Sequence, residues 1–116
     1  MSTTVIELED IYKILGEATT AYQQAVDRTI KAKNTLENLR LVKVATGEVT
    51  GKNEDERKAK TVELLSEEFD LVKSCEATER ACKLAYDLAC QRLDHFKLKV
   101  KAIELAGIDD REVSYD

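Results

Sequence analysis

The sequence predicts an all-α fold, a long coiled-coil-like antiparallel two-helix hairpin that associates with further copies into a helical bundle. Proline is absent from the 116 residues and only four residues are glycine, whereas a β-sandwich or barrel needs frequent turns. Charged residues make up 35% and hydrophobic residues 43% of the chain, a balance typical of long, solvated helices. The apolar residues recur at steps of three and four, which keeps them on one side of a helix.

The first helix is predicted over about residues 5–44. Thr4 and Glu7 form a capping-box pattern, in which each side chain satisfies a free N–H of the first turn. Thr46-Gly47 is a typical C-terminal stop. Between these signals one apolar stripe, the first seam, repeats at steps of three and four: Leu8, Ile11, Leu15, Ala18, Tyr22, Ala25, Thr29, Ala32, Leu36 and Leu39.

A loop over about 45–53 and a second helix over about 54–106 complete the single predicted domain, residues 1–116. Asn53 and Glu56 repeat the capping pattern, and Gly107 is expected to end the helix before an acidic tail, 107–116. Two successive steps of three over residues 69–75 form a stammer that should overwind the supercoil locally. The second seam is Val62, Leu65, Phe69, Val72, Cys75, Glu79, Cys82, Tyr86, Ala89, Leu93, Phe96, Val100 and Ile103.

The two predicted helices differ in length, which leaves apolar surface without a partner. Pairing outward from the loop sets Lys43 opposite Glu54 and Val5 opposite about Arg92, so that the end of the second helix overhangs. The overhang carries Leu93, Phe96, Val100 and Ile103, and a second apolar row follows the same helix at Ala77, Ala81, Leu84, Ala85 and Leu88. We expect one or more further copies of the chain to bury both sets; the alternative is a kink near the stammer that folds the C-terminal part back.

The sequence predicts no catalytic, cofactor or metal site. Cys75, Cys82 and Cys90 lack the close pairs of a zinc site and are expected to be reduced thiols, the first two as small core residues. His95 is the single histidine and is expected at a surface or an interface. The segment 47–53 resembles a phosphate-binding loop but has one residue too few between its glycines, so it is predicted to be a plain turn. A two-helix hairpin is also expected to offer no catalytic cleft.

Two regions are locally basic although the net charge is −5. The alternative prediction is that these strips bind nucleic acid or a nucleotide, since cations attract phosphates. The cations concerned are Arg28, Lys31, Lys33, Arg40 and Lys43 in the first helix, and Arg92, Lys97 and Lys101, with Lys99, in the second. A solvated face of mixed charge is the competing interpretation, as it is for the acidic stretch from Glu63 to Glu79.

The loop and the start of the second helix read Gly51-Lys52-Asn53-Glu54-Asp55-Glu56-Arg57-Lys58-Ala59. This GKN-x-x-ERKA segment resembles one found in small uncharacterised helical proteins of bacteriophages and prophages. The resemblance implies a phage origin and a location in the bacterial host cytoplasm. It implies neither an enzymatic activity nor any functional residue. The N-terminus lacks the basic region of a signal peptide, and no stretch is apolar enough for a membrane span.

The predicted function is that of a non-catalytic phage or prophage interaction protein. It would present a helical surface to a host or phage protein, as an accessory factor or an inhibitor of a host pathway such as defence. The contacts are expected at the overhang, at Ala81, Leu84, Ala85 and Leu88 of the second row, and at Lys52, Arg57 and Lys58 beside the loop. The alternative is a nucleic-acid or nucleotide-binding accessory protein of phage replication or recombination.

Overall fold

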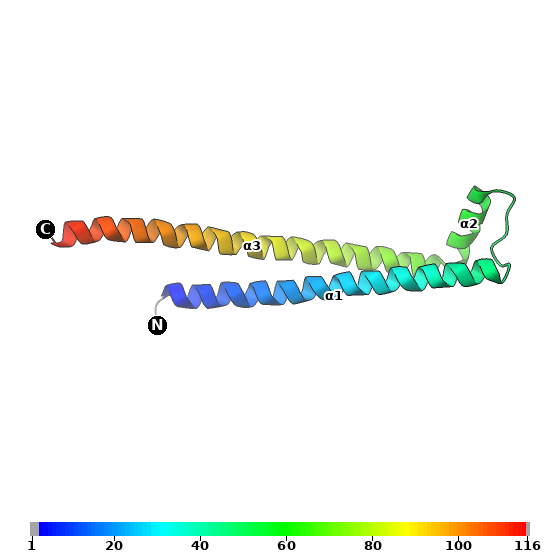
Figure 1. The fold of residues 1–116 in the computed structure, drawn as a ribbon, viewed down its shortest axis with the longest axis horizontal. Helices are drawn as coiled ribbons and strands as arrows, with labels where there is room; N and C mark the ends of the chain where they lie inside the picture. The colour runs from blue at the N-terminus through cyan, green and yellow to red at the C-terminus, as the bar shows by residue number, and fades with distance from the viewer. Residues whose placement is uncertain (1–2, 116) are drawn as a thin grey trace. The chain divides into compact units, whose positions relative to one another are not determined.

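The computed structural model describes the backbone of residues 3–115 and the side chains of residues 3–107. This part of the chain contains three helices and no strand: α1 (Thr3–Ala45), α2 (Glu54–Leu64) and α3 (Ser66–Tyr115) (Figure 1). The predicted all-α hairpin is therefore confirmed. The chain divides into two compact units, which are described separately below.

The first unit joins α1 up to Thr20 with α3 from Leu84 onward. The two helices run antiparallel, since Asp10 contacts Arg92 at 3.1 Å and the earlier Glu7 contacts the later Lys99 at 3.2 Å. Ile11, Ala89 and Phe96 are at most 6% exposed and form the core of this unit. The packing of seam against seam thus follows the predicted periodicity.

The register of this pairing differs from the prediction. Arg92 lies opposite Asp10, five residues further along α1 than the predicted partner Val5. Lys43 and Glu54 form ion pairs with other residues, Glu48 and Lys58 respectively. The expected register assumed one continuous second helix.

The second unit spans Ala21–Lys83 and contains the rest of α1, the loop, α2 and the first turns of α3. Ala25, Ala32, Leu65 and Val72 are buried in its core. Thr29 is 2% exposed, and its hydroxyl donates a hydrogen bond of 3.0 Å to the carbonyl of Ala25, so this buried polar group is satisfied. In both units together, all ten predicted seam residues of α1 are buried or half-buried.

The predicted single helix over 54–106 is wrong, because the chain leaves the helical conformation at Leu65 (φ −117°, ψ 30°). Leu65 is 2% exposed and Thr61 is 7% exposed, whereas Val62 is 50% exposed, so the second seam begins at Leu65. The break lies four positions before the start of the stammer, and α3 is one helix across the stammer at 69–75. Within this unit the axis of α2 is steeply inclined to the axes of α1 and α3 (Figure 1).

The loop follows the predicted local rules. Gly47 adopts a left-handed conformation (φ +77°) just after the end of α1, as a C-terminal glycine does. Asn53 caps α2, since its Oδ1 accepts a hydrogen bond of 2.9 Å from the backbone N–H of Glu56. In return the Glu56 carboxylate accepts one of 2.7 Å from the backbone N–H of Lys52. The loop start and the second capping pattern are therefore confirmed.

Both outer ends of the hairpin differ from the prediction. α1 begins at Thr3, so Thr4 lies inside the first turn, and Glu7 accepts a hydrogen bond from Lys99 instead of completing a capping box. α3 continues through Gly107 to Tyr115, so the expected end of the helix at Gly107 is wrong. A single glycine costs a helix only about 1 kcal/mol relative to alanine, and no proline follows to stop it.

Candidate functional site

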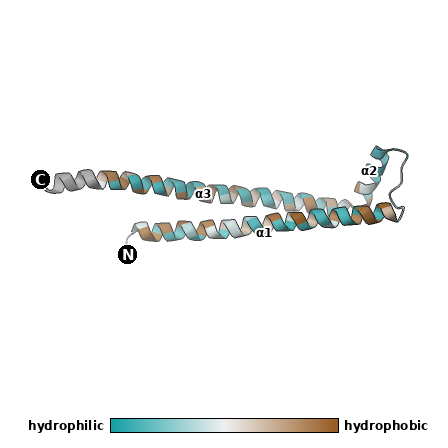
Figure 2. Ribbon diagram, in the orientation of Figure 1, coloured by the Kyte–Doolittle hydropathy of each residue, from teal (hydrophilic) through white to brown (hydrophobic). Residues whose placement is uncertain are grey.

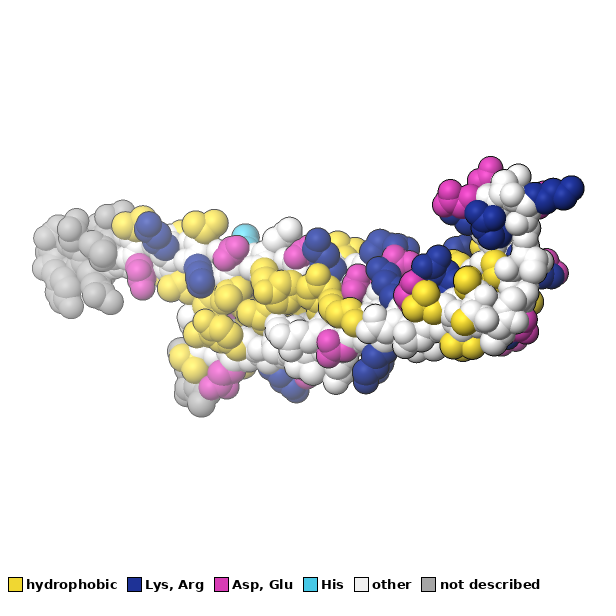
Figure 3. All heavy atoms as spheres, turned by 45° about the vertical axis from the view of Figure 1, so that its right-hand side comes forward, with side chains coloured by type: hydrophobic (Ala, Val, Ile, Leu, Met, Phe, Trp, Pro, Cys, Tyr) yellow, Lys and Arg dark blue, Asp and Glu magenta, His cyan; other side chains and the backbone are white. Residues whose placement is uncertain are grey.

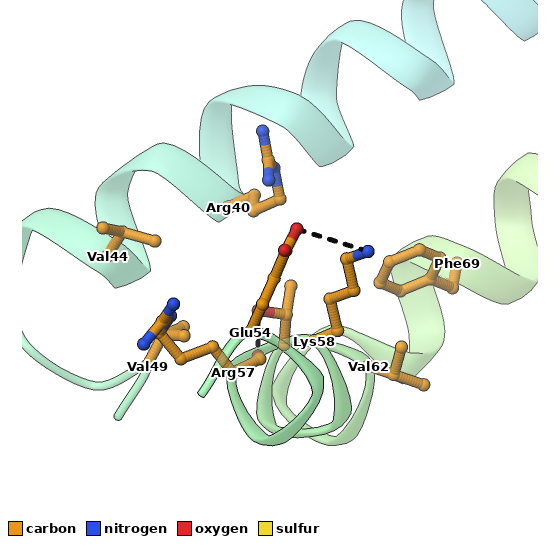
Figure 4. Close-up of a pocket in the computed structure, with 9 residues that line it drawn as sticks. Arg40, Val44, Val49, Glu54, Arg57, Lys58, Val62 and Phe69 are labelled. Atoms are coloured by element: carbon orange, nitrogen blue, oxygen red, sulfur yellow. Dashed lines mark hydrogen bonds and ion pairs between the residues drawn. The ribbon is translucent and has the colours of Figure 1, made fainter. Parts of the chain in front are cut away.

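A pocket of about 450 Å³ lies in the second unit, beside the loop (Figure 4). The end of α1, the loop, α2 and the start of α3 all contribute to it. Its lining residues are Arg40, Val44, Val49, Glu54, Arg57, Lys58, Thr61, Val62 and Phe69. The sequence did not predict this pocket, which forms because the break at Leu65 sets α2 apart from α3 and opens space between α2 and α1.

Part of the pocket lining is apolar. Val44, Val49, Val62 and Phe69 contribute their side chains, and Val44 and Val62 are 54% and 50% exposed. Leu41 and Val42 extend this hydrophobic end of α1 at 55% and 52% exposure (Figure 2). So many open aliphatic groups at one end of a helix are unfavourable in water, and such a patch is typical of a binding surface.

The charged part of the pocket lining is mostly basic. It consists of Arg40, Arg57 and Lys58 with a single acid, Glu54. Lys58 contacts Glu54 at 3.4 Å along the same side of α2, as Figure 4 shows. The Nη1 of Arg57 donates a hydrogen bond of 3.3 Å to the carbonyl of Gly51, and in the described part of the chain Arg57 has no carboxylate partner. A ligand carboxylate would therefore find an uncompensated guanidinium in the pocket lining.

Near the pocket, Arg40 and Lys43 each contact a glutamate and lower the pKa of its carboxyl group. The Arg40 side chain donates hydrogen bonds of 2.6 and 3.1 Å to the Glu37 carboxylate, and this lowers the pKa of Glu37 and raises the pKa of Arg40. Hydrogen bonds from Lys43 and Thr46 lower the pKa of Glu48. These pairs orient the cations at the end of α1 but lie at the exposed surface, where ion pairs contribute little to stability.

The loop reaches the pocket because glycine stands at position 51. A Cβ at Gly51 would lie 2.8 Å from the Cβ of Glu56 and 3.0 Å from the backbone nitrogen of Arg57. No other residue type allows the loop to pack this closely on the first turn of α2. This contact also brings the Gly51 carbonyl within reach of the Arg57 guanidinium.

The structure separates the three predicted loop contacts. Arg57 and Lys58 line the pocket, whereas Lys52 does not and contributes only its backbone N–H to the cap. The sequence did not predict that Arg40, Val44, Val49 and Phe69 line a pocket. A signal was present for the first helix, since Leu41, Val42 and Val44 lie outside its seam and therefore have no predicted partner there.

The predicted overhang is mostly covered. Phe96 is buried and Leu93 and Val100 are half-buried. The break at Leu65 shifts the register of α3 against α1, so that Arg92 lies opposite Asp10 and the first turns of α1 extend past these residues. Only Ile103, at 55% exposure, is open as expected. The second row is exposed throughout, at Ala77, Ala81, Leu84, Ala85 and Leu88.

The basic strips are partly neutralised inside the chain. Lys33 pairs with Glu76, Arg40 with Glu37, Lys43 with Glu48 and Arg92 with Asp10. Four further cations of the two strips form no ion pair with another described residue: Arg28, Lys31, Lys97 and Lys101. Arg28 lines a second hollow of about 160 Å³ together with Ala25, Ser74, Cys75 and Thr78. The structure brings no more than one basic-strip residue into each of these two hollows.

The remaining candidates lie apart from the pocket. The three cysteines are half-buried free thiols, and His95 is exposed on α3. The described residues contain no group of three or more His, Cys, Asp or Glu side chains placed to hold a metal ion. No described helix has an apolar stretch long enough to cross a membrane.

Comparison of the chain with protein-family models, curated proteins and solved structures finds no match.

Proposed function

We propose that this chain is a non-catalytic interaction protein that binds an acidic and apolar segment of another protein in the pocket beside the loop. One observation carries the proposal: the exposed aliphatic side chains of Val44 and Val62 line the same pocket as three cations and one acid. A segment with a hydrophobic side chain next to a carboxylate would satisfy both parts of this surface. The volume of about 450 Å³ is enough for a few side chains.

The partner is expected to be a host or phage protein in the bacterial cytoplasm. This part of the proposal depends on the resemblance of the GKN-x-x-ERKA segment to phage and prophage proteins. Gly51, Arg57 and Lys58 of that segment all take part in building or lining the pocket.

Nucleic-acid binding has less support as an alternative. Five of the nine cations in the two strips already pair with carboxylates of the same chain: Lys33, Arg40, Lys43, Arg92 and Lys99. A phosphate backbone would have to displace these acids before it gained the full contact.

A random peptide-display selection on the purified full chain tests the proposal without knowledge of the partner. We expect the selected peptides to share one or two acidic residues beside a large apolar residue. The double variant Arg57→Glu/Lys58→Glu should lose at least tenfold in affinity for the best peptide. The matched control is Arg28→Glu/Lys31→Glu, which reverses two charges outside the pocket and should bind as the natural chain does.

Two results would overturn the proposal. One is a selection that yields no acidic and apolar motif. The other is a motif that binds the Arg57→Glu/Lys58→Glu variant as tightly as the natural chain. A labelled oligonucleotide serves as the competing probe, and its tight, steeply salt-dependent binding would favour the nucleic-acid function instead.

A further inference from the structure

The outer edge of α3 carries an apolar row that continues well beyond the predicted second row, which ended at Leu88. Leu84, Leu88, Leu98 and Leu105 are 60%, 55%, 67% and 59% exposed. Together with three further exposed residues they form one row at alternating steps of four and three, which we call the outer row: Leu84, Leu88, Gln91, His95, Leu98, Ala102 and Leu105.

The outer row lies on the side of α3 that faces away from α1. Each of its members follows a seam residue by two positions, as Leu84 follows Cys82 and Leu98 follows Phe96. Two positions correspond to about 200° around an α-helix, so the row and the seam occupy opposite faces. Figure 3 shows hydrophobic side chains and the histidine along this edge. No described residue of α1 can cover it.

The spacing of the outer row is that of a coiled-coil core. Steps of four and three over residues 84–105 amount to three heptads, about 33 Å of helix. Leucine occupies three of the four positions equivalent to d, a preference typical of two-stranded coiled coils. The row therefore suits another helix of the same kind.

The charges beside the outer row point to a second copy of this chain in parallel orientation. Asp87 and Asp94 lie on one flank, and Arg92 and Lys99 lie on the other. In a parallel pair, one flank of each helix faces the opposite flank of its partner about five residues further on. Asp87 would then meet Arg92 of the second copy, and Asp94 would meet Lys99 of the second copy. An antiparallel pair would instead set Arg92 against Lys99.

Arg92 and Lys99, the cations beside the outer row, each contact a carboxylate of α1. Arg92 contacts Asp10 at 3.1 Å and Lys99 contacts Glu7 at 3.2 Å, yet their side chains are still 45% and 49% exposed. Each can therefore bridge a carboxylate of its own chain and one of a second copy.

Gln91 and His95 fix the register. Both interrupt the leucines at the centre of the row, and both are exposed in the single chain. In register they face the same residues of the second copy, where amide and imidazole groups can hydrogen-bond to each other. A shifted register would bury them against leucine at a cost.

We propose that the outer row of α3 pairs in parallel and in register with the same row of a second copy, to form a two-fold symmetric dimer. This proposal is independent of the pocket, because the outer row belongs to the first unit and the pocket to the second. Failure of one therefore leaves the other intact.

Sedimentation equilibrium of the full chain at micromolar concentrations measures the association. The natural chain should have twice the 13.1 kDa chain mass. Leu88→Glu/Leu98→Glu should have the mass of a single chain and keep its helical circular dichroism, since both side chains are exposed in that chain. The matched control, Leu41→Glu/Val42→Glu, changes two equally exposed residues outside the row and should stay dimeric. His95→Leu should tighten the dimer about tenfold, because it removes a polar core residue.

Cross-linking tests the orientation. In a background with Cys75→Ala, Cys82→Ala and Cys90→Ala, the Ala102→Cys chain should form a disulfide-linked dimer on mild oxidation. Lys97→Cys, outside the row, should not. A single-chain mass for the natural protein, or a dimer that survives Leu88→Glu/Leu98→Glu, would overturn the proposal. A dimer that Ala102→Cys does not cross-link would overturn the parallel, in-register arrangement.

Discussion

The guanidinium of Arg92 lies 3.1 Å from the carboxylate of Asp10, and this contact joins residues 82 positions apart in the sequence. The pair reports the register of α3 against α1 in the first unit. Together with the Lys99–Glu7 contact it places the buried Phe96 between the levels of Asp10 and Glu7 of α1, instead of on an overhang without a partner. One exposed ion pair therefore shows why most of the predicted overhang is covered.

The Arg92–Asp10 contact itself should contribute little to stability. Both side chains are about half exposed, so a double-mutant cycle with Arg92→Ala and Asp10→Ala should give a coupling energy of about 0.5 kcal/mol. Urea unfolding followed by circular dichroism measures it, and added salt should reduce it further. A coupling of several kcal/mol would show that this pair, and not the apolar seam, determines the register.

Phe96→Ala should destabilise the fold by about 3 kcal/mol or more, because the ring is 6% exposed and its removal leaves a cavity. Leu41→Ala is the matched control: its side chain is 55% exposed, and the change in unfolding free energy should stay within about 0.5 kcal/mol. Urea unfolding of both variants is the measurement. If Phe96→Ala were as mild as Leu41→Ala, then Phe96 would belong to an open overhang after all.

Two glycine substitutions should change stability in opposite directions. Gly51→Ala forces a Cβ to within 2.8 Å of the Glu56 Cβ and should destabilise by about 1 kcal/mol or more. Gly16→Ala meets nothing within 4 Å in the middle of α1 and should stabilise by about 0.5–1 kcal/mol through helix propensity. Thermal unfolding compares them. A neutral Gly51→Ala would contradict the close packing of the loop on α2.

The Glu37 carboxylate should stay ionised to lower pH than an ordinary glutamate, because the Arg40 hydrogen bonds lower its pKa. A lowered folded-state pKa stabilises the fold above the ordinary pKa, and this contribution is lost as the pH falls through the lowered value. NMR titration of the side-chain carboxyl carbons measures the pKa directly. Arg40→Gln should raise the pKa of Glu37 toward its usual range.

Lys43→Gln provides the matched control for that titration. It should raise the pKa of Glu48, whose carboxylate accepts a hydrogen bond from Lys43, and leave that of Glu37 in place. If both substitutions moved both carboxylates equally, then the shifts would come from general surface charge and not from the specific pairs.

Much of this protein follows from local sequence patterns. The steps of three and four predicted the seam that buries Ile11, Ala25 and Phe96, since helical periodicity depends only on neighbouring residues. Gly47, Asn53 and Glu56 predicted the loop and the cap of α2, because turn and capping chemistry acts over three or four positions. Of the candidate site, Arg57 and Lys58 were identified from the sequence.

The break at Leu65, the register and the pocket depend on contacts between distant residues. Neither proline nor glycine marks Leu65, and local propensity therefore predicts a continuous helix there. Burial of Thr61 and Leu65 in the core of the second unit overrides that propensity. The break removes the 11 residues of α2 from the straight pairing, so that Arg92 meets Asp10 and a pocket opens between Val44 and Val62. A local sequence pattern does not reveal the free energy that is gained when residues far apart in the chain pack together.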